Sequence, residues 1–211
     1  MSSTPLLNVK NLNFHYPQRE LFKDFSVDIN AGVTIITGDD GCGKTSFLQL
    51  LAGVLPMQSG QIVVNANKVV SDPHVYLNHV FWVDAHNDQI DNILVKDYLA
   101  SLASSYQNFS QQILEEAIAG LALDAHLEKQ FFMLSTGTKR KVWLAAALSS
   151  GCTITLLDDA FAGVDKLSIQ FFITALNRTL AESRQAWIIS TYHQLEALEN
   201  LHTIDLGANV L

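Results

Sequence analysis

Cysteine and proline are scarce in this chain, with two Cys and four Pro among 211 residues. Cys42 and Cys152 lie far apart and form no C-x-x-C pair, so neither a disulfide framework nor a zinc site is indicated. Internal repeats, low-complexity tracts and linkers rich in Pro, Gly and Ser are also missing. We therefore expect a single domain over residues 1–211 that suits a reducing cytosol.

Long apolar runs and an excess of positive charge are missing too. No stretch approaches the roughly 18 continuous apolar residues of a membrane-spanning helix, and Met1 to Leu7 do not resemble a secretory signal. Lys and Arg number 13 against 21 Asp and Glu, which gives a formal net charge of -8. Because nucleic-acid binding needs a basic footprint, we expect no nucleic-acid partner. We also expect a chain that is neither secreted nor membrane-spanning.

The chain does have enough apolar sequence for a core, with 48% hydrophobic and 16% charged residues. Short apolar or alternating runs predict strands at 6–9, 22–29, 33–37, 80–83, 153–157 and, as the last buried one, 187–190. Helical apolar spacing predicts helices at 46–52, within 94–127 behind an N-cap at Ser110, at 139–148 and at 167–180. The order predicts an α/β fold with a parallel sheet and an antiparallel β region on one side.

Residues 38–45, Gly-Asp-Asp-Gly-Cys-Gly-Lys-Thr, match the phosphate-binding pattern G-x-x-x-x-G-K-[ST] between a predicted strand and a predicted helix. The glycines let successive N–H groups and the positive end of the helix face the β- and γ-phosphates. The ammonium of Lys44 would lie against those oxygens, and the Thr45 hydroxyl would join the shell of Mg²⁺. The alternative is a glycine-rich turn with an exposed lysine. The predicted phosphate-loop contacts are Gly38, Asp39, Asp40, Gly41, Cys42, Gly43, Lys44, Thr45 and Ser46, with the two carboxylates pointing outward.

A second acidic motif follows the apolar strand at 153–157, which ends in Asp158 and Asp159. Open α/β sheets bind ligands at the carboxyl ends of their strands. Asp158 is therefore the candidate to hold Mg²⁺ through water, and Asp159 is the candidate to orient or deprotonate the attacking water. On its own, a strand that ends in two acids indicates only a surface strand terminus.

With these motifs the chain resembles the ATP-binding subunits of ABC transporters, which add a signature near L-S-G-G-Q. The matching segment is Leu134-Ser135-Thr136-Gly137-Thr138, and its separation from Asp158 is the one usual in the family. The resemblance implies a P-loop NTPase with a parallel β-sheet core, an antiparallel β subdomain and an α-helical subdomain at about 94–148. It implies ATP and Mg²⁺ as cofactors. It also implies that Ser135 and Gly137 contact the γ-phosphate held by the opposite subunit, whereas the residues alone indicate a helix cap.

Further positions match the family pattern. Tyr16 resembles the aromatic on which adenine stacks, the alternative being a core or edge-strand tyrosine. Asp165 fits the family's dimer-contact aspartate, or else a helix N-cap. His193 resembles the switch histidine that contacts the γ-phosphate, with Tyr192 one residue away and a solvent-facing histidine as the alternative.

Two departures from the family bear on catalysis. Asp159 stands where a glutamate is usual, and because a misplacement near 1 Å can cost about 10²-fold in rate, we expect slow hydrolysis. His86 occupies the place of the family's loop glutamine, with Gln89 a weaker candidate and a plain polar loop the alternative. A histidine there can still hydrogen-bond the nucleophilic or a Mg²⁺-bound water.

The resemblance implies a working arrangement. Two copies, or this chain and a second cassette, would bind two Mg·ATP at their shared face and drive a separate integral membrane permease docked at residues 86–93 and the helices after them. The chain would then lie in the cytoplasm, peripheral on the cytoplasmic face of the cell membrane. The signature substitutions look closer to exporters. The alternatives are a soluble ATP-switched ATPase of this fold, acting on ribosomes, DNA or cofactor assembly, and a degenerate subunit that binds nucleotide beside an active relative.

Overall fold

Two sheets organise the computed structural model, which describes residues 4–64, 79–83, 88–193, 195, 197–198 and 201–207. One sheet has five parallel strands in the order β5-β6-β7-β3-β8. Its strands are β3 (Gly32–Thr37), β5 (Val80–Trp82), β6 (Ile154–Leu157), β7 (Ala186–Ser190) and β8 (Leu201–Asp205). The other is antiparallel, in the order β2-β1-β4, and consists of β1 (Leu7–Tyr16), β2 (Arg19–Ile29) and β4 (Ser59–Val64). The expected combination of a parallel core and an antiparallel β region is confirmed.

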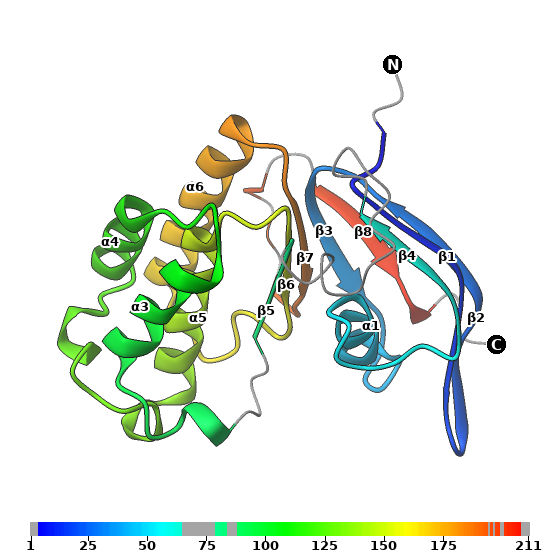
Figure 1. Cartoon of the computed structure of the whole chain (residues 1–211), viewed down its shortest axis with the longest axis horizontal. Coiled ribbons are helices and arrows are strands. Elements are labelled where there is room, and N and C mark those ends of the chain that lie inside the picture. The colour runs from blue at the N-terminus through cyan, green and yellow to red at the C-terminus, as the bar shows by residue number, and fades with distance from the viewer. Residues whose placement is uncertain are drawn as a thin grey trace.

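Helices cover both faces of the parallel sheet (Figure 1). The longer ones are α1 (Lys44–Leu51), α3 (Val95–Ser105), α4 (Gln111–Gly120), α5 (Thr136–Ser150) and α6 (Lys166–Glu182). Short 3₁₀ turns lie at η1 (Asp88–Ile90), η2 (Asp124–His126) and η3 (Phe131–Met133). Helices α3 to α6 lie on one side of the sheet, whereas α1 and the antiparallel sheet lie on the other. None of the helices in the described part of the chain is long and apolar enough to cross a membrane.

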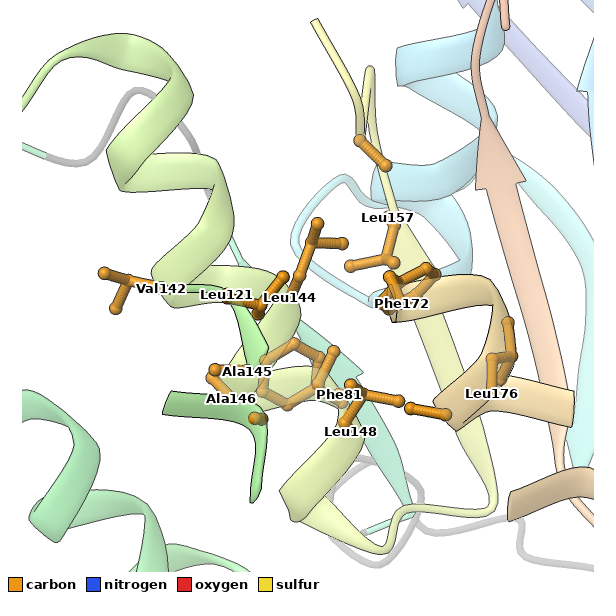
Figure 2. Close-up of a cluster of buried hydrophobic side chains, with 14 of the residues drawn as sticks. Phe81, Leu121, Val142, Leu144, Ala145, Ala146, Leu148, Leu157, Phe172 and Leu176 are labelled. Atoms are coloured by element: carbon orange, nitrogen blue, oxygen red, sulfur yellow. The ribbon is translucent and has the colours of Figure 1, made fainter. Parts of the chain in front are cut away.

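The inner strands β3, β6 and β7 are mostly apolar and almost entirely buried because both of their faces are covered. In β7, Trp187 and Ile189 pack with the helices α3 to α6, while Ala186 and Ile188 pack with α1 and the antiparallel sheet. Figure 2 shows the helical side of this core, where Leu157 meets side chains of α5 and α6. Each such Leu, Ile or Phe removed from water contributes about 1.5–3 kcal/mol.

Helix boundaries follow the capping side chains. The Ser110 hydroxyl accepts a hydrogen bond from the Ile113 amide at 3.3 Å, which confirms Ser110 as the N-cap of α4. Helix α5 begins at Thr136, three residues before the predicted start, because the Ser135 hydroxyl caps it by accepting the Thr138 amide at 3.2 Å.

The prediction of 187–190 as the last buried strand is confirmed by β7, and one more strand in the described part of the chain, β8, follows it and is mostly exposed. Strand β8 pairs in parallel with β3 at the edge of the sheet. Its sequence, Leu-His-Thr-Ile-Asp, is largely exposed, and only Ile204 packs against the core as a partly buried side chain. A strand with so few apolar residues shows no alternating hydrophobic pattern in the sequence. Only its hydrogen bonding to β3 in the structure identifies it as a strand.

Candidate functional site

The phosphate loop joins the end of β3 to the start of α1, and its shape depends on three glycines. Gly38, Gly41 and Gly43 have positive φ angles of 134°, 77° and 105°, which L side chains rarely adopt. A Cβ at Gly38 would also lie 2.6 Å from the Sγ of Cys42, which is buried inside the loop. The three glycines therefore let the backbone turn tightly between β3 and α1, which begins at Lys44.

The ammonium of Lys44 folds over this loop. Its Nζ donates to the backbone oxygens of Gly38 at 2.7 Å and Asp39 at 3.0 Å. The same Nζ lies 5.0 Å from the centre of the Tyr192 ring, within the range of a cation–π contact. The Tyr192 hydroxyl in turn donates to the carboxylate of Asp40. Asp39 and Asp40 are both exposed, and Asp40 lines the cavity at the phosphate loop.

The phosphate loop and the acidic motif meet through one hydrogen bond. The Thr45 hydroxyl on α1 donates to Oδ2 of Asp158, just beyond β6, at 2.6 Å. A hydroxyl and a carboxylate are oxygen donors of the kind that Mg²⁺ prefers, and protein sites usually complete its shell with water and phosphate oxygens. The described residues contain no group of three or more His, Cys, Asp or Glu placed to hold a metal ion. Thr45 and Asp158 thus fit the predicted Mg²⁺ site.

Tyr16 lies at the mouth of the same loop. Its side chain is 42% exposed, its hydroxyl is 3.2 Å from Oγ of Ser46, and its ring stands edge-on to Phe14 with the ring centres 5.0 Å apart. A cavity of about 390 Å³ is lined by Tyr16, Arg19, Leu21, Asp40, Gly41, Gly43, Lys44, Thr45, Ser46 and Tyr192. An exposed aromatic ring and the phosphate loop therefore share one cavity.

Asp159 contacts α5. Its Oδ2 accepts from Nη2 of Arg140 at 2.7 Å, and its backbone oxygen accepts from Nε of the same side chain at 2.8 Å. Asp159 also has a positive φ of 45°, which is uncommon for a residue with a side chain. Sequence reasoning missed Arg140, because a partner 19 positions upstream on another element leaves no local pattern.

The signature segment packs tightly against the loop that follows β6. A Cβ added to Gly137 would lie only 2.0 Å from the backbone oxygen of Gly163. Ser135 is exposed at the start of α5, where it acts as the N-cap. The helix-cap interpretation of this segment is confirmed, and a contact of Ser135 or Gly137 with a second subunit stays a prediction.

Asp165 likewise acts as a cap, at the start of α6. Its Oδ1 accepts from the Ser168 amide at 2.9 Å, and its Oδ2 lies 2.6 Å from Nζ of Lys141 on α5. The Lys141 ammonium, helped by the Ser168 amide and hydroxyl, holds the pKa of the Asp165 carboxyl well below its usual range. Its role as a dimer contact stays a prediction.

Of the two histidines predicted as catalytic, His193 lies within the described residues and His86 does not. His193 is exposed, its amide donates to the Thr191 hydroxyl at 3.0 Å, and its ring centre lies 6.1 Å from that of Phe161. Its neighbour Tyr192, and not His193, contacts Lys44 and Asp40 of the phosphate loop. His86 lies outside the described residues, and the weaker candidate, Gln89, lies exposed in η1.

Comparison with known proteins decides the family. The ABC transporter family model matches residues 22–162, which include the phosphate loop, the signature segment and both acids after β6. The chain belongs to the ABC transporter family. It is an ATP-binding subunit of that family, whose cassettes are ATPases.

Two curated ABC relatives match over most of their length. The cytochrome c biogenesis ATP-binding export protein CcmA of Hahella chejuensis is 28% identical over 207 residues, which cover 97% of each chain. The molybdate import ATP-binding protein MolC of Haemophilus influenzae is 27% identical over 197 residues, covering 89% of this chain and 73% of the relative. A solved ATP-binding subunit of an ABC transporter superposes with a TM-score of 0.80 at 19% identity, over 96% of this chain and 87% of that one, and supports the fold alone.

Proposed function

We propose that this chain binds Mg·ATP at the phosphate loop, hydrolyses it slowly and thereby drives a separate membrane-spanning partner. The observation that carries the proposal is the 2.6 Å hydrogen bond between Thr45 and Asp158. This hydrogen bond brings the phosphate loop and the acidic motif together although they are distant in the sequence. A metal ion bound to a triphosphate would need the hydroxyl of one and the carboxylate of the other. A glycine-rich turn with an exposed lysine would have no reason to contact the acidic strand end.

In this proposal each residue has a distinct task. Backbone amides of residues 38–45 and the start of α1 receive the β- and γ-phosphates, and Lys44 leaves its backbone contacts to pair with them. Thr45 and Asp158 hold Mg²⁺, which would neutralise charge on the phosphates. The ring of Tyr16 stacks on adenine. Asp159 orients the attacking water and takes up its proton.

We further propose that the nucleotide joins two cassettes. Each ATP would lie between the phosphate loop of one chain and Ser135 and Gly137 of the other, where the N-terminus of α5 would favour an anion. Nucleotide then favours the closed pair because it contacts both chains only in that state, and hydrolysis reopens it. Sedimentation of the Asp159→Asn variant with Mg·ATP should show dimers. Monomers at saturating ATP would contradict a pair of identical chains and would leave only a pair with a different cassette.

Slow turnover follows from the short side chain of Asp159. Aspartate is one methylene shorter than the usual glutamate, so its carboxylate stands farther from the water it must orient, at a cost of up to about 10²-fold. Asp159→Glu should therefore raise kcat at unchanged affinity for Mg·ATP, and Asp159→Asn should abolish most turnover. If kcat is the same in all three proteins, Asp159 is not the catalytic carboxylate. If none of the three hydrolyses ATP, the degenerate-subunit alternative is favoured.

The membrane partner is proposed from the family and its relatives. Export is favoured by the signature substitutions and by the full-length likeness to a relative named for export. Affinity purification from detergent-solubilised membranes should recover this chain with an integral membrane protein. Recovery together with a solute-binding protein would contradict export. Recovery only from the soluble fraction would instead support a soluble ATPase of the same fold.

A further inference from the structure

Arg140 holds the proposed catalytic carboxylate by two separate contacts. Its Nη2 donates to Oδ2 of Asp159 at 2.7 Å, and its Nε donates to the backbone oxygen of the same residue at 2.8 Å. A single planar guanidinium therefore fixes both the backbone and the side chain of Asp159. Such a fork constrains direction as well as distance, which an ammonium cannot do.

Burial makes this contact firmer than an ordinary surface ion pair. The side chain of Arg140 is only 14% exposed, whereas that of Asp159 is 44% exposed. The cation is thus anchored within the protein on α5, and the carboxylate reaches from it toward solvent. Exposed ion pairs contribute little to stability because ordering two mobile side chains costs entropy. The Arg140 side chain is mostly buried, so this cost is smaller for its pair with Asp159.

The contact also leaves one carboxylate oxygen available. Arg140 takes Oδ2, and no donor among the described residues contacts Oδ1. The positive φ of Asp159 lies in a region that costs free energy unless the surroundings enforce it, and the Arg140 bond to its backbone oxygen is one such restraint. The result is a carboxylate with one oxygen anchored and the other free to accept a proton.

We propose that Arg140 is a positioning residue for hydrolysis, which fixes Asp159 so that Oδ1 faces the attacking water. In the step, the water oxygen bonds to the γ-phosphorus, its proton passes to Oδ1, and the bond to the β-γ bridging oxygen breaks to release ADP. This inference rests on the proposed function, since it needs Asp159 to act on the water. It also ties the catalytic carboxylate to α5, the helix that begins with the signature segment.

The test is a double-mutant cycle of Arg140→Gln and Asp159→Asn, read by steady-state ATP hydrolysis of the purified full-length chain with Mg²⁺. Arg140→Gln should lower kcat about 10- to 100-fold, the scale of a misplacement near 1 Å, and leave KM within about twofold. In the Asp159→Asn background the same change should have no further effect, because there is no carboxylate left to position. Arg140→Lys keeps the charge without the fork and should give an intermediate kcat.

Arg178→Gln is the matched control, because Arg178 is also a helical arginine paired with a carboxylate, Glu116, on another helix. It should leave kcat unchanged. If Arg140→Gln lowers kcat by the same factor with and without the Asp159 carboxylate, or leaves kcat intact, the positioning role is wrong and the proposed function stands. If Asp159→Asn retains wild-type kcat, both are overturned. If thermal unfolding shows that Arg140→Gln is not folded, the same cycle with Arg140→Lys in the wild-type and Asp159→Asn backgrounds tests the positioning role.

Discussion

Replacing Gly137 by alanine tests how tightly the signature segment packs on the loop after β6. The new Cβ would lie 2.0 Å from the backbone oxygen of Gly163 and 2.8 Å from its carbonyl carbon. Real Cβ atoms do not approach closer than about 3.0 Å, so α5 and the loop must separate by about 1 Å. Since both sides of the contact are backbone, no side-chain rotation can relieve it.

The expected cost follows from two opposing effects. Overpacking of this kind costs about 2–3 kcal/mol, and alanine regains about 1 kcal/mol of helix propensity relative to glycine. The net loss of about 1–2 kcal/mol should lower the thermal midpoint by roughly 2–8 °C for a chain of this length. Calorimetric or circular-dichroism melting measures it, with Thr136→Ala, an exposed neighbour in the same turn, as control. A Gly137→Ala midpoint at or above that of wild type would refute the packing argument.

Three further predictions concern the site and its support. Thr45→Val removes the hydroxyl proposed to face the metal, so calorimetry should show weaker binding of Mg·ATP and nearly unchanged binding of ATP in EDTA. An equal loss of affinity with and without Mg²⁺ would contradict the metal role of Thr45. Tyr192→Ala removes a cation–π contact on Lys44 worth about 0.5–1 kcal/mol, so Mg·ATP should bind about two- to fivefold more tightly, whereas Tyr192→Phe should not change it. Asp165→Asn should lower stability at pH 7, because the depressed folded pKa of Asp165 means that its pairing with Lys141 contributes above the unfolded pKa near 4. That difference should shrink as the pH falls below 4, and a difference constant between pH 7 and pH 3 would contradict it.

The sequence predicted the parts of the site that are local in the chain. Residues 38–45 form a phosphate loop because their glycines adopt the positive φ angles that the pattern requires. Asp158 could be placed beside Thr45 because strands of a parallel sheet end at one edge, and a buried apolar run shows where β6 ends. These inferences depend on short-range pattern, which a linear sequence carries in full.

Contacts between side chains that are distant in the sequence could not be predicted in the same way. Arg140 stands in a run of three basic residues, Lys139-Arg140-Lys141, and nothing in that run distinguishes the one that meets Asp159 from the one that meets Asp165. The rotation of α5 decides it, since adjacent helical residues point about 100° apart. Tyr192 reaches the phosphate loop where the family pattern points to His193, because the turn after β7 decides which side chain faces Lys44.

Titration calorimetry of the full-length chain with Mg·ATP measures directly whether residues 38–45 bind nucleotide. We expect one nucleotide bound per chain and at least about 10-fold weaker binding for Lys44→Ala, because charge-assisted hydrogen bonds to phosphate contribute about 1.5–3 kcal/mol each. Lys96→Ala, which removes an exposed lysine paired with Glu128 on the helical side, should bind like wild type. Absence of binding by the wild-type chain, or equal affinity with and without the Lys44 ammonium, would contradict the assignment of residues 38–45 as the nucleotide site.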